Sequence, residues 1–109
     1  MFNFKQFTVI LFILFPNFAN ASLICDLKDQ STCTEILNED DVQLVDQVQK
    51  ICQQNNDSLK VGNCSTQNLV GTCFFMQPVV THYYAPEYNN YGAEMTCNYS
   101  RGKYVRNKN

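Results

Sequence analysis

Six cysteines, placed between residues 25 and 97 of a 109-residue chain, constrain the fold more than any other feature of the sequence. They are Cys25, Cys33, Cys52, Cys64, Cys73 and Cys97. No Cys-x-x-Cys pair of the kind that zinc sites use is present, and His82 is the only histidine. An even number of cysteines in a short chain with an export signal is typical of a disulfide framework. We therefore expect three disulfides, whose pairing the sequence leaves open, and neither a metal nor a cofactor.

The first 21 residues have the composition of a signal peptide. Lys5 is their only charged residue, and it is followed by a predominantly apolar run over residues 7–15 that Pro16 ends. Ala19 and Ala21 supply the small side chains that a signal peptidase accepts at its −3 and −1 positions. We expect cleavage after Ala21.

Two alternatives to a cleaved leader are weaker. The apolar run would make a helix of only about 14 Å, too short for a bilayer core of about 30 Å. A lipid anchor at Cys25 would need a small residue where Ile24 stands. The mature chain is then a single domain, residues 22–109, without a membrane span and either secreted or periplasmic. In a domain of this size the apolar core is small, and each disulfide can add about 2–4 kcal/mol of stability.

Residues 41–54 have the periodicity of an amphipathic helix. Five residues share one face, and glutamines occupy most of the other; the five are Leu44, Val45, Val48, Ile51 and Cys52. Asn38 is the candidate N-cap, with Leu37 and Val42 placed to form a hydrophobic staple. We expect the disulfide of Cys52 to fix this helix to the core.

The second half of the chain favours strands. Residues 69–76 and 79–84 are rich in β-branched and aromatic side chains and are separated by Gln77 and Pro78, which predicts a β-hairpin. Residues 93–97 are expected to form a short helix and residues 103–105 a last strand. Residues 59–64 are expected to form a turn or a short strand. Residues 22–37 are expected to form a short polar segment that Cys25 and Cys33 tie to other parts of the chain. The predicted fold class is α+β: a small disulfide-rich domain with one main amphipathic helix, a β-hairpin and a short C-terminal helix and strand.

The order of landmarks along the chain resembles that of a group of exported proteins. The segment Val70-Gly71-Thr72-Cys73 with its flanking cysteines is the most specific element, and Gly62-Asn63-Cys64 and Gly102-Lys103-Tyr104 lie on either side of it. In these features the chain resembles small cysteine-rich exported proteins of Gram-negative bacteria. The resemblance implies a shared scaffold and an envelope or secreted location, and it supplies no catalytic residue. The chain departs from the pattern in lacking a proline after Cys64 and in having Tyr104 where tryptophan is commoner.

All six tyrosines fall between residues 83 and 104, with asparagines among them. Tyrosine mixed with asparagine and glycine is typical of binding loops, because each ring offers a large contact area and a hydroxyl group. The candidate binding residues are Tyr84, Tyr88, Asn89, Asn90, Tyr91 and His82. Alternatively, the strand tyrosines pack across the sheet, and alternation then sends one of Tyr83 and Tyr84 inward.

Two weaker patterns would support an enzyme. His82 is the only candidate general base near neutral pH, and Glu87 and Glu94 flank the tyrosines as a possible carboxylate pair. Neither carries the local signature of a nucleophile–base–acid site. A small secreted hydrolase that uses His82 or the Glu87/Glu94 pair is therefore the second hypothesis.

Charge divides the chain unevenly. Residues 22–57 carry a net charge of −6 and residues 58–109 a net charge of +3. Because the whole chain is acidic, we expect no nucleic-acid partner. The favoured function is a non-enzymatic exported binding protein that recognises a protein or a glycan, with a secreted effector or virulence-associated factor as one form of it. A structural envelope protein is the third hypothesis.

Overall fold

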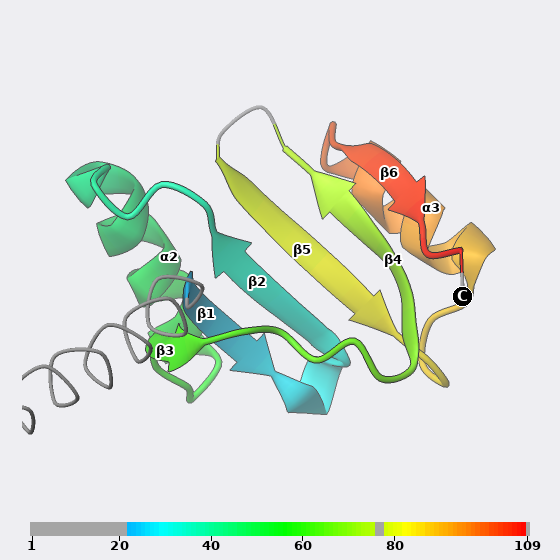
Figure 1. Ribbon diagram of the computed structural model, residues 1–109, viewed down its shortest axis with the longest axis horizontal. Helices are drawn as coiled ribbons and strands as arrows, with labels where there is room; N and C mark the ends of the chain where they lie inside the picture. The colour runs from blue at the N-terminus through cyan, green and yellow to red at the C-terminus, as the bar shows by residue number, and fades with distance from the viewer. Residues whose placement is uncertain (1–21, 76–77, 109) are drawn as a thin grey trace, which may run out of the picture.

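The computed structural model describes residues 22–75 and 78–108, which fold into a six-stranded antiparallel sheet and two α-helices (Figure 1). The strands lie in the order β3-β1-β2-β5-β4-β6. In chain order the elements are β1 (Ser22–Leu27), the 3-10 turn η1 (Lys28–Gln30), β2 (Thr32–Ile36), α2 (Val42–Gln54), β3 (Lys60–Gly62), β4 (Leu69–Phe74), β5 (Val79–Tyr84), α3 (Asn90–Tyr99) and β6 (Lys103–Arg106). The predicted α+β class is confirmed. The predicted leader lies outside the described residues, and none of the helices within them has the length and apolar character that crossing a bilayer requires.

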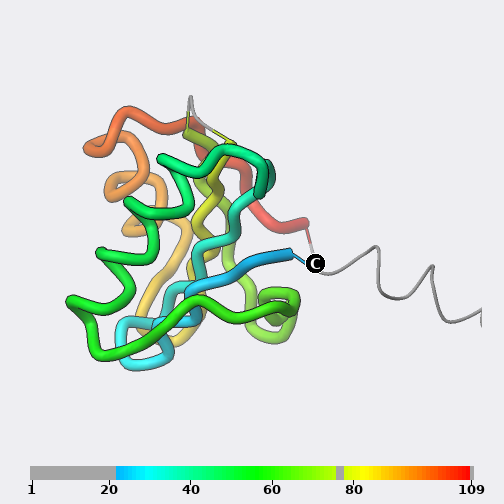
Figure 2. The backbone as a smooth tube through the Cα atoms, turned by 90° about the vertical axis from the view of Figure 1, so that its left-hand side faces the viewer, coloured from blue at the N-terminus to red at the C-terminus, as the bar shows by residue number. Residues whose placement is uncertain are grey.

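Both helices lie on the same side of the sheet, as the turned view in Figure 2 shows. We call this side the helix face and the other side the open face. Strand alternation divides the residues between them: Cys25 of β1, Thr34 of β2, Thr81 of β5 and Cys73 of β4 are consecutive cross-strand partners that all point to the helix face.

Three disulfides crosslink the fold, and all six cysteines take part. Two of the bridges join a helix to the sheet. Cys25–Cys52 ties α2 to β1, and Cys73–Cys97 ties α3 to β4. Cys33–Cys64 instead ties β2 to the link between β3 and β4. The predicted disulfide framework and the role of Cys52 are therefore confirmed.

Two small cores lie under the two helices. The core under α2 is aliphatic and contains Ile36, Leu44 and Val48. The core under α3 contains the Cys73–Cys97 bridge, Ala93 and Tyr83, with Tyr88 and Tyr104 packed against it. Each helix therefore has its own core.

Several local predictions need correction. Residues 22–36, which lack a clear sequence pattern, form the two strands β1 and β2. Asp41 rather than Asn38 caps α2, because its side chain accepts a hydrogen bond from the N–H of Leu44 at 3.2 Å. Leu37 and Val42 are both exposed, so they do not close into a buried staple.

The second half follows the predictions more closely. The hairpin of β4 and β5 is present, with β4 ending at Phe74 and residues 76–77 of the connection outside the described part. The helix expected over residues 93–97 is longer, because Asn89 caps it and adds a turn at its N-terminus. β6 forms where a last strand was expected.

Candidate functional site

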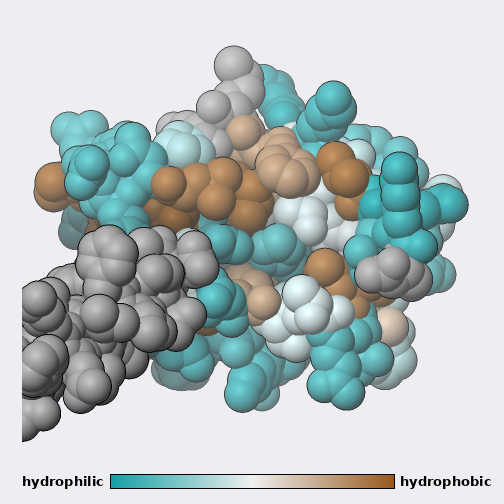
Figure 3. All heavy atoms as spheres, viewed as in Figure 1, coloured by the Kyte–Doolittle hydropathy of each residue, from teal (hydrophilic) through white to brown (hydrophobic). Residues whose placement is uncertain are grey.

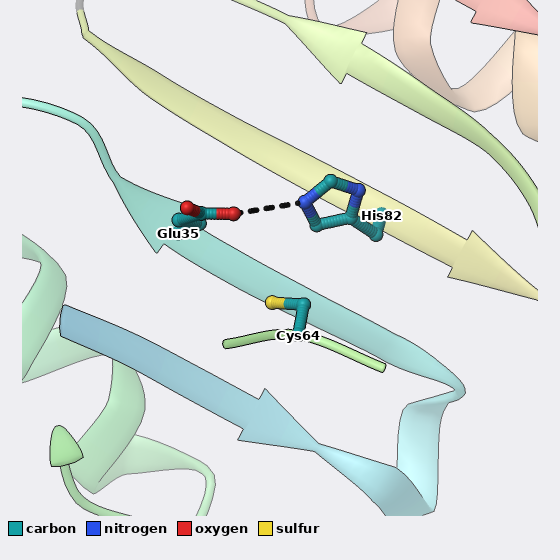
Figure 4. A group of neighbouring side chains, drawn as sticks. All are labelled: Glu35, Cys64 and His82. Atoms are coloured by element: carbon teal, nitrogen blue, oxygen red, sulfur yellow. Dashed lines mark hydrogen bonds and ion pairs between the residues drawn. The ribbon is translucent and has the colours of Figure 1, made fainter. Parts of the chain in front are cut away.

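A row of three polar side chains crosses the open face from β4 to β2. Thr72 Oγ1 lies 2.8 Å from His82 Nδ1, and His82 Nε2 lies 3.2 Å from Glu35 Oε1 (Figure 4). The strand register produces the row, because Thr72 and His82 are direct cross-strand partners and His82 follows Val80, the partner of Glu35, by two residues. The side chains of His82 and Glu35 are 16% and 21% exposed, so the pair is shielded from water without being sealed off.

Within the row, each of the two imidazole nitrogens of His82 has a hydrogen-bond partner. With a neutral ring, the Thr72 hydroxyl donates to Nδ1 and the Nε2–H group donates to Glu35; a protonated ring donates from both nitrogens. The carboxylate that meets His82 is thus Glu35, which sequence reasoning did not single out. Glu94 lies on α3, across the sheet from His82, and Glu87 is exposed.

Thr72, His82 and Glu35 follow the order of a nucleophile, a base and an acid, yet the position of the row does not favour acyl transfer. β5 lies between β2 and β4, so the sheet takes up the N–H groups around His82. An oxyanion hole needs preorganised donors that are free to meet the developing charge. The geometry therefore gives the hydrolase hypothesis no support beyond the three side chains themselves.

Cys64 lies beside this row. Donor atoms of Glu35, Cys64 and His82 all lie within 4.8 Å of one another. Figure 4 shows the three side chains converging from β2, from β5 and from the link that crosses in front of β2. The Sγ atom of Cys64 is bonded to Cys33, and a disulfide sulfur does not supply the thiolate that metals bind.

The predicted tyrosine surface is divided between the two faces of the sheet. Tyr83 points to the helix face and is 3% exposed, whereas Tyr84 points to the open face, as alternation predicts. Burial, reinforced by the neighbouring Tyr88 and Tyr104, raises the pKa of Tyr83 to about 12. Burial, followed by the nearby carboxylates of Asp26 and Glu35, likewise raises the pKa of Tyr84 to about 12.

Besides His82, four of the candidate binding residues make contacts within the fold. Tyr88 packs edge-on against Tyr83, with ring centroids 4.9 Å apart. Asn89 accepts a hydrogen bond from the N–H of Gly92 at 2.8 Å and so caps α3. Asn90 accepts a hydrogen bond from the Tyr104 hydroxyl at 2.9 Å. The hydroxyl of Tyr84 donates to the carbonyl of Ser65.

Tyr91 differs, because it belongs to an exposed stripe along α3. Tyr91, Met95 and Tyr99 are spaced four residues apart and are 73%, 54% and 92% exposed. At 100° per residue they lie opposite Ala93 and Cys97, which are fully buried. We call these three residues the α3 stripe. The sequence did not indicate Met95 and Tyr99, because the expected helix covered only residues 93–97. The three side chains line up only on a helix that runs from Tyr91 to Tyr99.

An apolar cavity of about 390 Å³ lies between the two helices, beside the carboxyl end of α3. Val48 and Ile51 of α2, Phe75 and Val79 form most of its wall, and among the described residues that line it Arg101 alone is charged. Ser100 and Arg101, which directly follow α3, bring the cavity next to the end of the helix that carries the α3 stripe.

The open face is less uniform. Figure 3 shows hydrophilic residues interspersed with apolar side chains, which gather over its upper part. Phe74 and Val105 are the exposed apolar residues that the register places on this face. Phe74 and Val105 are therefore exposed apolar residues away from α3, with which experiments on the α3 stripe can be compared.

Comparison of the chain with models of protein families, with curated proteins and with solved structures found no match.

Proposed function

We propose that this protein is a non-enzymatic, exported binding protein that recognises a protein partner through the α3 stripe. The observation that carries the proposal is the exposure of Tyr91, Met95 and Tyr99 on the outer face of one helix. Tyrosine and methionine are enriched at protein interfaces relative to the rest of a protein surface. Export into an oxidising compartment is supported by the pairing of all six cysteines.

The shape of the stripe favours one mode of recognition. Side chains repeated every four residues along a convex helix fit an apolar groove, as in complexes where an amphipathic helix is the ligand. The Cys73–Cys97 bridge already holds α3 on the sheet, so binding does not have to order the helix. The cavity beside Arg101 can receive one apolar side chain of the partner.

The charges around the α3 stripe favour a partner whose groove is bordered by acidic residues. Four of the ten residues that follow the stripe are basic: Arg101, Lys103, Arg106 and Lys108. The opposite end of the molecule, residues 22–57, carries the net charge of −6. A partner with acidic residues around its groove would be attracted to the α3 end and repelled by the α2 end. The same charges oppose a symmetric dimer through α3, which would bring the basic residues of two copies together.

Site-specific photo-crosslinking in exporting cells tests the proposal. A photoreactive phenylalanine analogue is placed at Tyr99, and the matched control carries it at Phe74 on the open face. We expect one discrete adduct from position 99, protease-sensitive and absent when Tyr91→Ala and Met95→Ala are added.

Other outcomes contradict the proposal. Equal adducts from positions 99 and 74 would mean non-specific contact. An adduct removed only by glycosidases would mean a glycan ligand, and an adduct of twice the chain's own mass would mean self-association. The absence of any adduct from position 99 would favour a structural envelope role.

A further inference from the structure

The open face holds a set of donor atoms that the binding function does not use. Glu35 on β2, Cys64 on the β3–β4 link and His82 on β5 come from three separate segments, yet their donor atoms lie within 4.8 Å of one another (Figure 4). Cys33, bonded to Cys64, is the direct cross-strand partner of His82 and therefore points to the same face. The Cys33 sulfur, 2.06 Å from that of Cys64, thus adjoins the three donors of Glu35, Cys64 and His82.

Of the three disulfides, Cys33–Cys64 is the one whose sulfur a reducing thiol can reach. The other five cysteines have 2% or less of their surface exposed, whereas Cys64 is only partly buried. Cys25–Cys52 and Cys73–Cys97 lie under the two helices, where their sulfurs are shielded from a reductant. Besides the bridge, a hydrogen bond of 2.8 Å from the Tyr84 hydroxyl to the Ser65 carbonyl holds the segment next to Cys64.

We propose that reduction of Cys33–Cys64 by a dithiol converts this set into a zinc site, with Cys33, Cys64, His82 and Glu35 as ligands. A thiolate of the reductant attacks Cys64 Sγ, and the bond to Cys33 breaks, releasing Cys33 as a thiol once it gains a proton. The second thiol of the reductant then attacks its own mixed-disulfide sulfur and frees Cys64. The reductant leaves as a cyclic disulfide, having supplied two electrons and two protons.

Zinc binding then displaces the two thiol protons to solvent. Zn²⁺ prefers four ligands in a tetrahedron, with bonds of about 2.3 Å to sulfur and about 2.1 Å to nitrogen and oxygen. Such bonds place neighbouring ligand atoms roughly 3.4–3.8 Å apart. The His82 Nε2 and Glu35 Oε1 atoms are 3.2 Å apart, so the metal ion can take the place of the hydrogen that links them. Cys64 Sγ lies within 4.8 Å of both atoms, so a shift of about an ångström brings it to bonding distance of the metal. The two sulfurs, 2.06 Å apart in the disulfide, separate when the bridge is reduced.

Thr72 completes the arrangement. Its Oγ1 atom lies 2.8 Å from His82 Nδ1 and can accept a hydrogen bond from the Nδ1–H group. A histidine that donates from one ring nitrogen presents the lone pair of the other to a metal, and such partners strengthen metal binding by about 10–100-fold. Here the free lone pair is that of Nε2, which faces Glu35.

Metal titration of the full mature chain tests the proposal. Mild dithiothreitol treatment, followed by mass mapping of alkylated cysteines, should show Cys33 and Cys64 reduced first. We expect this form to bind one Zn²⁺ per chain and the oxidised form to bind none. Co²⁺ in place of zinc should give the absorption of a tetrahedral site with thiolate ligands.

Variants separate the ligands from the fold. His82→Ala and Glu35→Gln should each weaken zinc binding at least tenfold, and Thr72→Val should weaken it by about 10–100-fold. Thr34→Val is the matched control on the opposite side of β2, and it should leave zinc binding unchanged.

Three results would overturn the proposal. They are reduction of another bridge before Cys33–Cys64, equal zinc binding by the oxidised chain or by a Cys33→Ser/Cys64→Ser variant, and unchanged affinity in His82→Ala. If the reduced chain loses its circular dichroism, added Zn²⁺ should restore it, and a failure to do so also contradicts the site.

Discussion

The two helices are attached to the sheet in the same way and yet present opposite surfaces to solvent. Each begins at a side-chain cap, Asp41 for α2 and Asn89 for α3, and each is held by one disulfide. The outer face of α2 is mostly glutamine and carries the exposed Asp46–Lys50 pair at 3.1 Å. The outer face of α3 instead carries the α3 stripe.

The difference lies in the number of apolar faces on each helix. Two helices of similar attachment need only one apolar face each to cover a sheet. α2 exposes Val42 and Ile51, but at 100° per residue these two side chains lie on opposite sides of the helix and form no stripe. α3 has a second apolar face that no described part of the chain covers, although exposing it gains nothing for folding. The proposed binding role therefore falls to α3 and not to α2.

Removal of the disulfides should give the largest effects and should affect both helices alike. The Cys25→Ala/Cys52→Ala and Cys73→Ala/Cys97→Ala variants open loops of sequence separation 27 and 24. Because the loops are similar, each pair should lower the free energy of unfolding by about 2–5 kcal/mol, measured by urea denaturation. A loss below about 1 kcal/mol for either pair would show that its helix does not depend on its bridge.

Alkaline pH should distinguish the two cores. Tyr83 belongs to the core under α3, and its pKa is raised from 10.0 to about 12, so the folded state favours the neutral phenol. The stability that this residue contributes is complete below about pH 10 and is lost as the pH rises towards 12. Urea denaturation across this range should show falling stability, and Tyr83→Phe should reduce the fall. An identical pH dependence in Tyr83→Phe would contradict the assignment.

A pair of glycine substitutions should show how tightly the α3 end is packed. A Cβ atom at Gly102 would overlap the sulfur of Cys73 and meet Cys97, which the bridge holds in place. Gly102→Ala should therefore cost about 1–3 kcal/mol of unfolding free energy. At Gly62, on β3, a Cβ atom would meet only Ile24, at an ordinary 3.7 Å. Gly62→Ala is the matched control, and equal losses in thermal denaturation would show that packing is not the cause.

The two caps should have the smallest effects. Asp41→Ala and Asn89→Ala each remove one hydrogen bond to the first turn of a helix, at 3.2 and 2.8 Å. Each should cost about 1 kcal/mol in urea denaturation, and Asp41→Asn and Asn89→Asp should restore most of it. If Asn89→Ala left stability unchanged but abolished crosslinking from position 99, Asn89 would belong to the binding surface instead.

The sequence was most informative where a short-range pattern decides the structure. The spacing of Leu44, Val48 and Cys52 predicted α2, and the β-branched runs on either side of Pro78 predicted the hairpin. β1 and β2 could not be predicted in this way, because their burial comes from partners far along the chain: Cys25 is paired with Cys52 and Cys33 with Cys64.

The candidate sites show the same limit. Tyr91 was identified from composition, but Met95 and Tyr99 join it only on a helix of the observed length. The meeting of Glu35 with His82 depends on the register of β2 against β5, two strands separated by more than 40 residues. No local pattern around Glu35 distinguishes it from the other acidic residues.

Chemical footprinting in the native surroundings tests most directly whether α3 is the recognition surface. Met95 of the α3 stripe is exposed to oxidation by peroxide, and Lys50 on the outer face of α2 is exposed to acetylation. Both rates are measured by mass spectrometry in the purified protein and again in intact exporting cells. The account predicts that Met95 is protected several-fold in the cells while Lys50 reacts at the same relative rate. Equal oxidation of Met95 in both settings, or protection of Lys50 in its place, would contradict it.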